Sequence, residues 1–208
     1  MRPPAREPRT GSDAIAALRE AIIADATSAP FTERGWQPVF QADPAARILL
    51  IGQAPGWRAQ ASGVPWDDPS GDRLVRWLGV SRERFHDPSV FAIVPMDFYF
   101  PGKAASGDLP PRRGFAERWH PPLFDELGEV RLTILVGAHA QRAYLPGRRA
   151  TLTETVHNWR EYGPELFPTV HPSPRNTAWH ARNPWFEAEA VPELRIAVAA
   201  ALEEEPRS

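Results

Sequence analysis

Residues 47–56 read Arg-Ile-Leu-Leu-Ile-Gly-Gln-Ala-Pro-Gly, and this stretch decides the expected fold. Four apolar residues in a row, bounded by turn formers, are typical of a strand that is buried on both faces. The turn that follows lets the backbone pass close to a ligand, and ligands of open α/β sheets bind at the carboxyl ends of strands. Taken alone, the turn could also be an ordinary strand-to-loop connection, so the rest of the chain must decide.

The other apolar runs predict three more strands, with helices between them. The further strands are expected over residues 90–94, 132–136 and 167–170. Helices are expected over residues 13–25, 69–78, 119–127 and 192–202 and after Gly137 as far as Leu145, while residues 30–46 indicate a loop with a short extended piece and residues 151–159 are ambiguous. Because strands and helices alternate, the sequence predicts a single-domain, three-layer α/β/α fold with a central, mostly parallel four-stranded sheet.

The ends of the chain differ in composition from its middle. Residues 1–12 are rich in Pro, Arg, Gly and Ser, which predicts a flexible N-terminal tail, with Ser12 or Asp13 as N-cap of the first helix. Residues 13–204 are expected to form one domain, since 208 residues suit a single core. The N-terminus lacks the apolar core of a signal peptide, and no apolar run approaches the ~20 residues of a membrane span. We therefore expect a cytoplasmic protein.

Charge and cysteine content narrow the classes of function. The chain has no cysteine, which excludes disulfides, thiolate zinc sites and iron–sulfur clusters, and its histidines show no metal-ligand spacing, so no cofactor and no metal are expected. The formal net charge is −2, so the whole chain is not a polycation. Lys103 is the only lysine; arginine suits phosphate contacts, but a GC-rich genome gives the same bias. A local basic face could still attract a polyanion.

A second motif lies far downstream of the first. Residues 171–176 read His-Pro-Ser-Pro-Arg-Asn and directly follow the fourth expected strand. In a parallel sheet the loops after the first, second and fourth strands open at one edge, which brings this motif close to residues 52–56 and Trp66. A site for an extruded nucleobase needs an aromatic ring, a carboxylate, a histidine and backbone donors for phosphates, and these loops contain them. His171 or Trp66 alone could instead be structural, but the six-residue grouping is much rarer.

Together the motifs resemble those of the uracil-DNA glycosylase superfamily. Residues 52–56 resemble its Gly-x-x-Pro water-activating loop, and residues 171–176 resemble its His-Pro-Ser leucine/arginine loop, closest to the single-strand-selective monofunctional enzymes. Residues 63–66, Gly-Val-Pro-Trp, resemble the Gly-x-Pro-Phe of the thermophilic iron–sulfur branch. Residues 68–72, Asp-Pro-Ser-Gly-Asp, resemble the Gly-Asp-x-Ser-Gly-Asp stretch of the branch without a carboxylate in its first motif. Over residues 47–190 the resemblance implies a monofunctional, cofactor-free, monomeric hydrolase that excises uracil from single-stranded or double-stranded DNA and releases free uracil.

The resemblance also implies a division of chemical roles. Cleavage of the N-glycosidic bond develops positive charge on the sugar, while the departing uracil becomes negative. His171 would donate a hydrogen bond to the O2 atom of the departing base, and Trp66 would stack on that base. Asp68 would support the oxocarbenium ion or the water, with Asp72 as the alternative carboxylate. Gln53 would orient the water.

Further residues are expected to hold the base and the DNA backbone. The expected base-binding group comprises Gly52, Ala54, Pro55, Gly56, Trp66, Asp97 and Phe100. The expected DNA-backbone group comprises Ser173, Arg175, Asn176, Lys103 and Gly137. Both groups lie in the loops that follow the expected strands, which is where an open α/β sheet binds ligands.

Three departures from the family affect the catalytic carboxylate and the choice of base. Ala54 stands where the best-known branch has an acid, and Gly56 stands where that branch has the tyrosine that excludes thymine. The second expected strand ends without the asparagine that reads uracil; Asp97 is the polar residue there, although its charge would repel a uracil carbonyl. Hypoxanthine, 5-hydroxymethyluracil or another oxidised pyrimidine is therefore an alternative substrate.

Two other classes of protein compete with a uracil glycosylase. The missing carboxylate in the first motif would also suit a non-catalytic protein that binds damaged DNA or nucleotides on the same fold. A small-molecule esterase or nucleotide hydrolase of the α/β class would need a Gly-x-Ser-x-Gly elbow or a Gly-x-x-x-x-Gly-Lys loop. The sequence contains neither motif.

Overall fold

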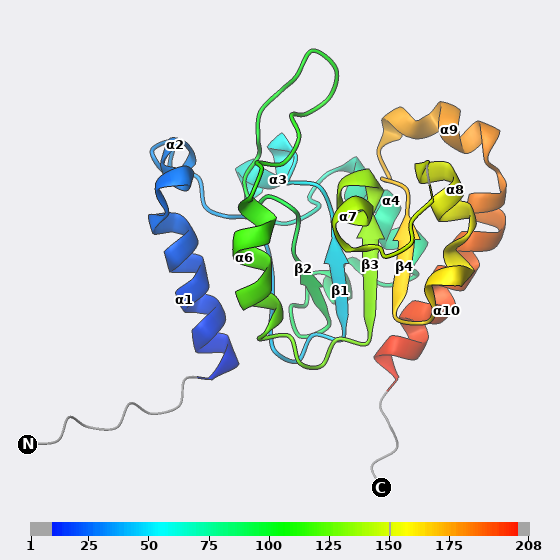
Figure 1. Ribbon diagram of the computed structural model, residues 1–208, viewed down its shortest axis with the longest axis horizontal. Coiled ribbons are helices and arrows are strands. Elements are labelled where there is room, and N and C mark those ends of the chain that lie inside the picture. Colours follow the sequence, from blue (N-terminus) through cyan, green and yellow to red (C-terminus); the bar gives the residue numbers. More distant parts are fainter. Residues whose placement is uncertain (1–9, 150, 204–208) are drawn as a thin grey trace, which may run out of the picture.

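A four-stranded sheet forms the centre of the computed structural model, which describes residues 10–149 and 151–203. Its strands are β1 (Ile48–Ile51), β2 (Phe91–Ile93), β3 (Leu132–Val136) and β4 (Leu166–Thr169), in the order β2-β1-β3-β4 (Figure 1). The neighbouring strands β1–β2, β1–β3 and β3–β4 are all parallel. The predicted α/β fold with a four-stranded parallel sheet is confirmed.

The apolar side chains of β1 place this strand in the interior of the sheet. Ile48 and Leu50 pack into the core on one face, whereas Leu49 and Ile51 pack into the core on the other. All four residues are buried. Because both faces of β1 are covered, its peptide groups cannot form hydrogen bonds with water. The parallel ladders to β2 and β3 supply these hydrogen bonds instead.

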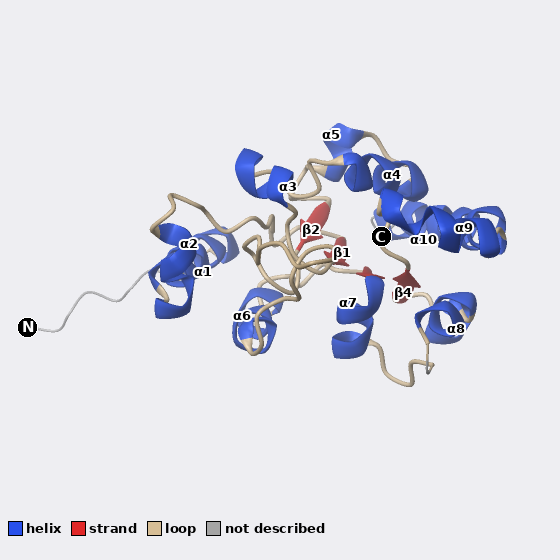
Figure 2. Cartoon of the chain, turned by 90° about the horizontal axis from the view of Figure 1, so that it is seen from above, coloured by secondary structure: helices blue, strands red, loops and turns tan. Residues whose placement is uncertain are grey.

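Helices cover both faces of the sheet (Figure 2). One face is covered chiefly by α4 (Pro69–Leu78) and α10 (Val191–Leu202), the other by α1 (Gly11–Ala24), α6 (Phe115–Phe124) and α7 (Gly137–Tyr144). The shorter helices are α2 (Ala29–Thr32), α3 (Trp57–Ser62), α5 (Arg82–Phe85), α8 (Leu152–His157) and α9 (Thr177–Arg182). Short 3₁₀ segments span Ala26–Ser28, Trp159–Tyr162 and Pro174–Asn176, and a π-helical turn spans Phe186–Ala190.

Capping residues explain where the main helices begin and end. Thr10 is the N-cap of α1 in a capping box with Asp13, so the helix starts earlier than expected and includes residues 11 and 12 of the expected tail. Residues 1–9 of that tail and residue 204 of the expected domain lie outside the described residues. Asp68 caps α4, and Gly79 ends it in the left-handed conformation, so α4 spans the expected residues 69–78.

The short helices are the elements that the sequence pattern did not predict. α3, α5 and α9 span at most six residues each, which is too short for a helical hydrophobic period to show. α8 lies in the ambiguous segment, and its capping box of Thr151 and Glu154 settles that segment as helical. α6 begins at Phe115, before the expected start, because Gly114 precedes it in the left-handed conformation and acts as its N-cap.

The order of the strands creates a crevice above β1. From β1 the chain adds β2 on one side and then β3 on the other, so the direction of strand addition reverses at β1. In open α/β sheets, ligands bind outside the carboxyl ends of the strands at such a reversal. The loops that follow β1, β2 and β4 therefore border a binding crevice.

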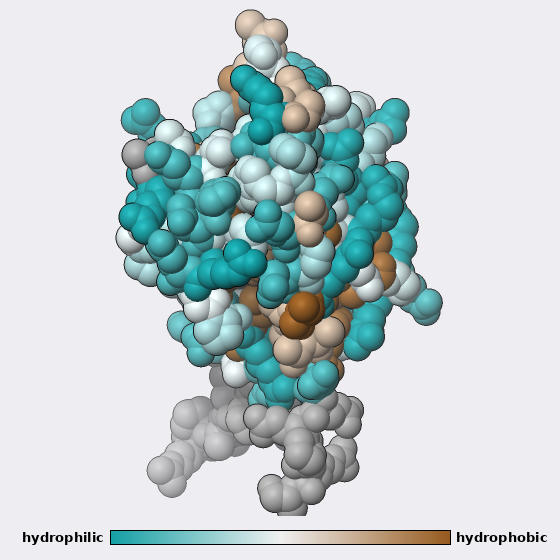
Figure 3. Space-filling model, turned by 90° about the vertical axis from the view of Figure 1, so that its right-hand side faces the viewer, coloured by the Kyte–Doolittle hydropathy of each residue, from teal (hydrophilic) through white to brown (hydrophobic). Residues whose placement is uncertain are grey.

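The surface of the described chain is polar over wide areas. The side that carries α9 and α10 is mostly hydrophilic, with a small apolar patch (Figure 3). On α10, Ile196 is 62% exposed. Of the helices that the structure describes, none is long and apolar enough to cross a membrane.

Candidate active site

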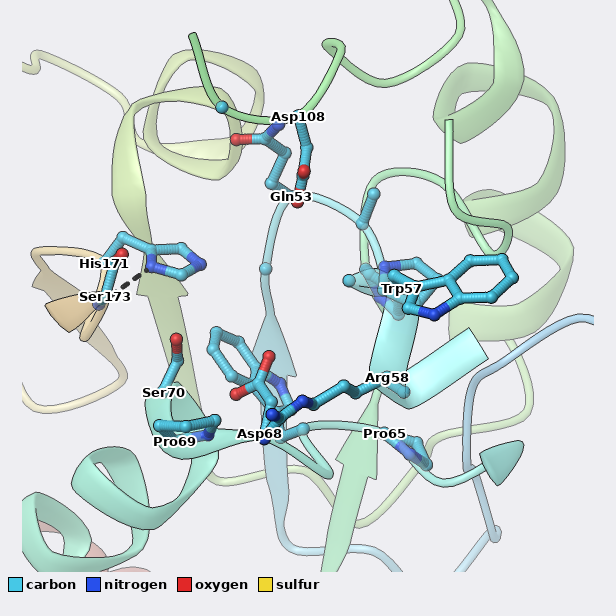
Figure 4. Close-up of a pocket in the computed structure, with 18 of the residues that line it drawn as sticks. Gln53, Trp57, Arg58, Pro65, Asp68, Pro69, Ser70, Asp108, His171 and Ser173 are labelled. Carbon is cyan, nitrogen blue, oxygen red and sulfur yellow. Dashed lines mark hydrogen bonds between the residues drawn. The ribbon is translucent and has the colours of Figure 1, made fainter. Parts of the chain in front are cut away.

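A cavity of about 680 Å³ lies at the carboxyl ends of the strands. Its lining includes residues 52–58 after β1, 65–66 and 68–70 at the start of α4, 103 and 107–108 after β2, and 171 and 173–176 after β4. The volume falls within the ~300–1,000 Å³ common for small-molecule sites. His171 and Trp57 lie on opposite sides of the cavity, and Asp108 and Asp68 lie at its top and bottom (Figure 4).

The loop after β1 forms one wall of the cavity. The carbonyl oxygens of Gly52 and Gln53 accept hydrogen bonds from backbone N–H groups of the loop after β2, at 2.9 and 3.1 Å respectively. Gly52 must lack a side chain, because a Cβ atom there would lie 2.9 Å from Cζ2 of Trp66. The Nε2 atom of Gln53 donates to the carbonyl of Leu109 at 3.2 Å. Its Oε1 atom is therefore left to accept a hydrogen bond from a substrate or water.

Trp66 lines the cavity in an unusual backbone conformation. Its φ is +58°, in the left-handed region that bulky residues rarely adopt. Gly71 makes this possible, because a Cβ atom at Gly71 would lie 1.8 Å from the carbonyl oxygen of Trp66. The indole lies beside the imidazole of His171, with ring centroids 5.3 Å apart and planes 36° apart. The strained turn thus brings together two rings that are remote in the sequence.

His171 enters the cavity from the loop after β4, and its hydrogen bonds define its protonation. The Nδ1 atom accepts from the N–H of Ser173 at 3.1 Å, while the amide of Asn176 donates to the carbonyl of His171 at 2.7 Å. Because Nδ1 is an acceptor, the proton of the neutral ring is on Nε2. Burial lowers the pKa of His171, an effect that the charges of Asp68 and Asp108 partly oppose. The ring is therefore a neutral donor that points into the cavity (Figure 4).

The two carboxylates proposed from the sequence occupy different surroundings. Asp68 lines the cavity. Its Oδ1 atom accepts a hydrogen bond from the N–H of Gly71 at 2.9 Å, and its Oδ2 atom faces Gly56. The side chain of Asp72 is 57% exposed and forms an ion pair with Arg82 at 2.5 Å. Asp72 does not contribute to the cavity lining. The structure therefore brings Asp68, and not Asp72, to His171 and Trp66.

Asp108 is a second carboxylate of the cavity that no sequence motif singled out. It lies in the loop after β2 and lines the cavity, with a side chain that is 32% exposed. The Nζ atom of Lys103 holds its Oδ1 atom at 2.7 Å. The sequence feature that could have indicated this carboxylate is the polar loop in which Lys103 and Asp108 flank a glycine. Within the described residues, no group of three or more side chains is arranged to hold a metal ion.

Asp97 takes part in a buried ion pair and does not line the cavity. Its side chain is fully buried, and the guanidinium of Arg112 donates to both carboxylate oxygens at 2.8 Å. The backbone N–H groups of Tyr99 and Arg112 donate to the same carboxylate at 3.1 Å. Phe100 is also buried and lies outside the lining, as does Gly137, which packs behind His171. The expectation that Asp97 and Phe100 contact the base is corrected, because their side chains point into the protein.

Replacing Asp97 by asparagine is expected to lower the free energy of unfolding by about 3 kcal/mol, because removing one partner of a buried ion pair leaves the other charge uncompensated. Urea denaturation measures this loss. Asp125→Asn, at an exposed carboxylate, is the matched control and should change stability by less than about 0.5 kcal/mol. Unchanged stability together with an altered choice of base would return Asp97 to base recognition.

The expected DNA contacts lie at the rim of the cavity. Arg175 is exposed. Its Nη1 atom would lie 3.3 Å from a Cβ atom added at Gly107, so the loops after β2 and β4 meet at this point of the rim. Ser173 caps the turn that carries Arg175, accepting its N–H at 3.2 Å. Lys103 and Asn176 also belong to the lining. Of the DNA-backbone group expected from the sequence, all except Gly137 therefore border one opening.

A comparison with protein families gives an independent result. The model of the uracil DNA glycosylase superfamily matches residues 39–195. The matched range contains all four strands and every segment that lines the cavity. The expected membership of this superfamily is thereby confirmed, whereas the individual motifs and the likeness to particular branches stay predictions.

Proposed function

This chain belongs to the uracil DNA glycosylase superfamily, and on this basis we propose that it is a monofunctional enzyme that extrudes uracil from DNA and hydrolyses its N-glycosidic bond. Membership indicates a DNA glycosylase for damaged bases, with DNA as its partner. One observation carries the finer assignment. Trp66 and Asp68, from the segment before α4, line the same cavity as His171, from the loop after β4.

The departing base is stabilised by His171. As the glycosidic bond breaks, its electron pair goes to the base, and negative charge develops on the uracil O2 atom. A neutral imidazole with its proton on Nε2 and its Nδ1 atom held by Ser173 is aimed to donate to that oxygen. A donor placed where charge develops lowers the barrier without reorganisation. Trp66, next to His171, supports the base by stacking.

The sugar requires a negative charge near its developing positive charge, and the attacking water requires a proton acceptor. Asp68 is suited to support the oxocarbenium ion, because only one of its oxygens is engaged, by the N–H of Gly71. Gln53 can orient a water through Oε1 but cannot accept its proton. Asp108, which borders the same cavity, can accept it. Two carboxylates in the cavity favour catalysis over the alternative of a non-catalytic damaged-DNA binder.

A wider choice of base is the second candidate function. Gly56 lines the cavity without a side chain, so the wall lacks the bulk that would exclude a methyl or hydroxymethyl group. Asp97 is engaged by Arg112, so it does not discriminate between bases. A cavity of about 680 Å³ also exceeds what one pyrimidine fills. Hypoxanthine and 5-hydroxymethyluracil are therefore the alternative substrates.

An excision assay tests both candidates. Labelled oligonucleotides carry uracil, hypoxanthine, thymine or 5-hydroxymethyluracil in single and double strands, and the released free base is identified by mass. We expect uracil release without a covalent protein–DNA product. Release of hypoxanthine or 5-hydroxymethyluracil in place of uracil would support the wider candidate. Binding to the same oligonucleotides without release of any base would overturn the catalytic assignment.

A further inference from the structure

The rim of the cavity exposes a large aromatic ring that the proposed chemistry does not use. Trp57 is 53% exposed and is the first residue of α3, directly after the Gly52–Gly56 loop. It lies on the opposite side of the cavity from His171 (Figure 4). Of the described residues, the other exposed large apolar side chains are Val64, Leu109 and Ile196. Val64 and Leu109 adjoin lining residues, so exposed apolar surface concentrates at this opening.

Aromatic neighbours hold Trp57 in place. Its ring meets Trp36 at a centroid distance of 5.7 Å and an angle of 63°, and it meets Phe100 at 6.0 Å and 67°. Trp36 and Phe100 also contact each other at 6.3 Å. Edge contacts of this kind fix the orientation of the indole while more than half of the residue stays accessible. A ring that is already fixed loses little conformational entropy when a ligand stacks on it.

Cationic side chains lie near this aromatic cluster of Trp36, Trp57 and Phe100, although one of them, Lys103, is also paired with Asp108. The guanidinium of Arg34 lies 5.4 Å from the ring of Trp36, and Nζ of Lys103 lies 5.6 Å from that of Phe100. Arg58 is exposed, lines the cavity and has no hydrogen bond or ion pair with another described residue. Aromatic platforms flanked by cations are the pattern by which proteins bind single-stranded nucleic acids.

The size of the cavity indicates that more than one nucleotide component fits it. Cavities of ~300–1,000 Å³ hold drug-sized ligands, and a single pyrimidine is much smaller than these. The cavity of about 680 Å³ continues from His171 across to Trp57 and Arg58. Space thus remains beside Trp57 when the extruded base occupies the position next to His171 and Trp66.

We propose that Trp57 is a stacking platform for the unpaired base next to the extruded nucleotide, and that Arg58 contacts the adjoining phosphate. This subsite rests on the proposed function, since it presupposes a damaged DNA strand in the cavity. A neighbouring base can reach Trp57 only after it leaves its own stack and pair. The cost of that step is smallest in a single strand, so the subsite makes single-stranded DNA the better ligand.

Binding to an oligonucleotide with a tetrahydrofuran abasic analogue tests the subsite without requiring excision. Trp57→Leu keeps an apolar side chain but removes the aromatic face, whereas Trp57→Phe keeps a face. For the single strand we expect Trp57→Leu to weaken binding by roughly 5- to 150-fold, the range that loss of one base stack gives, and Trp57→Phe to retain most of the affinity. The duplex should be affected less. Ile196→Ala, on the far α10 surface, is the control and should bind like the wild type.

A fluorescent 2-aminopurine placed on either side of the abasic analogue locates the stacked base. We expect the wild-type protein to quench the 2-aminopurine fluorescence when the probe is on one side of the analogue only. Trp57→Phe should preserve this quenching, and Trp57→Leu should abolish it. Equal binding and quenching by Trp57→Leu and wild type would overturn the subsite while leaving the proposed function standing. Wild-type binding to the abasic analogue, together with no base release in the excision assay, would overturn the catalytic function but not the subsite. No binding of either DNA form would overturn both.

Discussion

Replacing His171 by alanine is expected to lower kcat for base excision by about 10²–10³-fold, the usual effect of losing one donor to a developing oxyanion. The N–H on Nε2 is the group lost, and it acts mainly as charge builds on the departing base. Substrate binding, measured with the abasic analogue, should change little. Single-turnover release of uracil from a single-stranded oligonucleotide measures the effect.

His139→Ala is a matched control for His171, because His139 lies on α7 and outside the cavity lining. It should leave kcat unchanged. A pH profile adds a second test: burial lowers the pKa of His171 from its ordinary value of 6.5, so the neutral form persists through neutral pH. Protonation would place a hydrogen on Nδ1 and break the bond from Ser173, so activity should fall only below pH 6.5. Activity retained by His171→Ala would remove His171 from the mechanism.

Replacing Asp68 by asparagine is expected to lower kcat by about 10²-fold, because the substitution removes a negative charge beside the forming oxocarbenium ion. Asparagine is as good an N-cap as aspartate, so the bond to the N–H of Gly71 and the start of α4 should survive. The same single-turnover assay measures the loss. An unchanged thermal midpoint would show that the loss is chemical and not structural.

Asp72→Asn is the matched control in the same helical turn. Asp72 is exposed and paired with Arg82, and exposed ion pairs contribute only ~0–1 kcal/mol. We expect full activity and nearly full stability from this variant. If Asp72→Asn lost activity and Asp68→Asn kept it, the carboxylate role would belong to Asp72.

The sequence by itself determined the sheet and the two motifs that border the cavity. The run Ile48–Ile51, the glycine turn after it and the His-Pro-Ser-Pro-Arg-Asn loop are local features, and local features follow from periodicity and turn chemistry. The start of α4 at Pro69 and its end before Gly79 could be predicted for the same reason. α3, α5 and α9 could not, because a helix of one or two turns shows no period.

Only the tertiary structure decided which polar side chains face the cavity. Asp97 and Asp108 both follow β2, yet one pairs with Arg112 inside the protein and the other reaches the cavity beside Lys103. The packing of Trp57 on Trp36 and Phe100 likewise joins the start of α3 to two separate loops. Spacing along the chain determines local geometry, but the partner of a charge or a ring is set by residues that folding brings close.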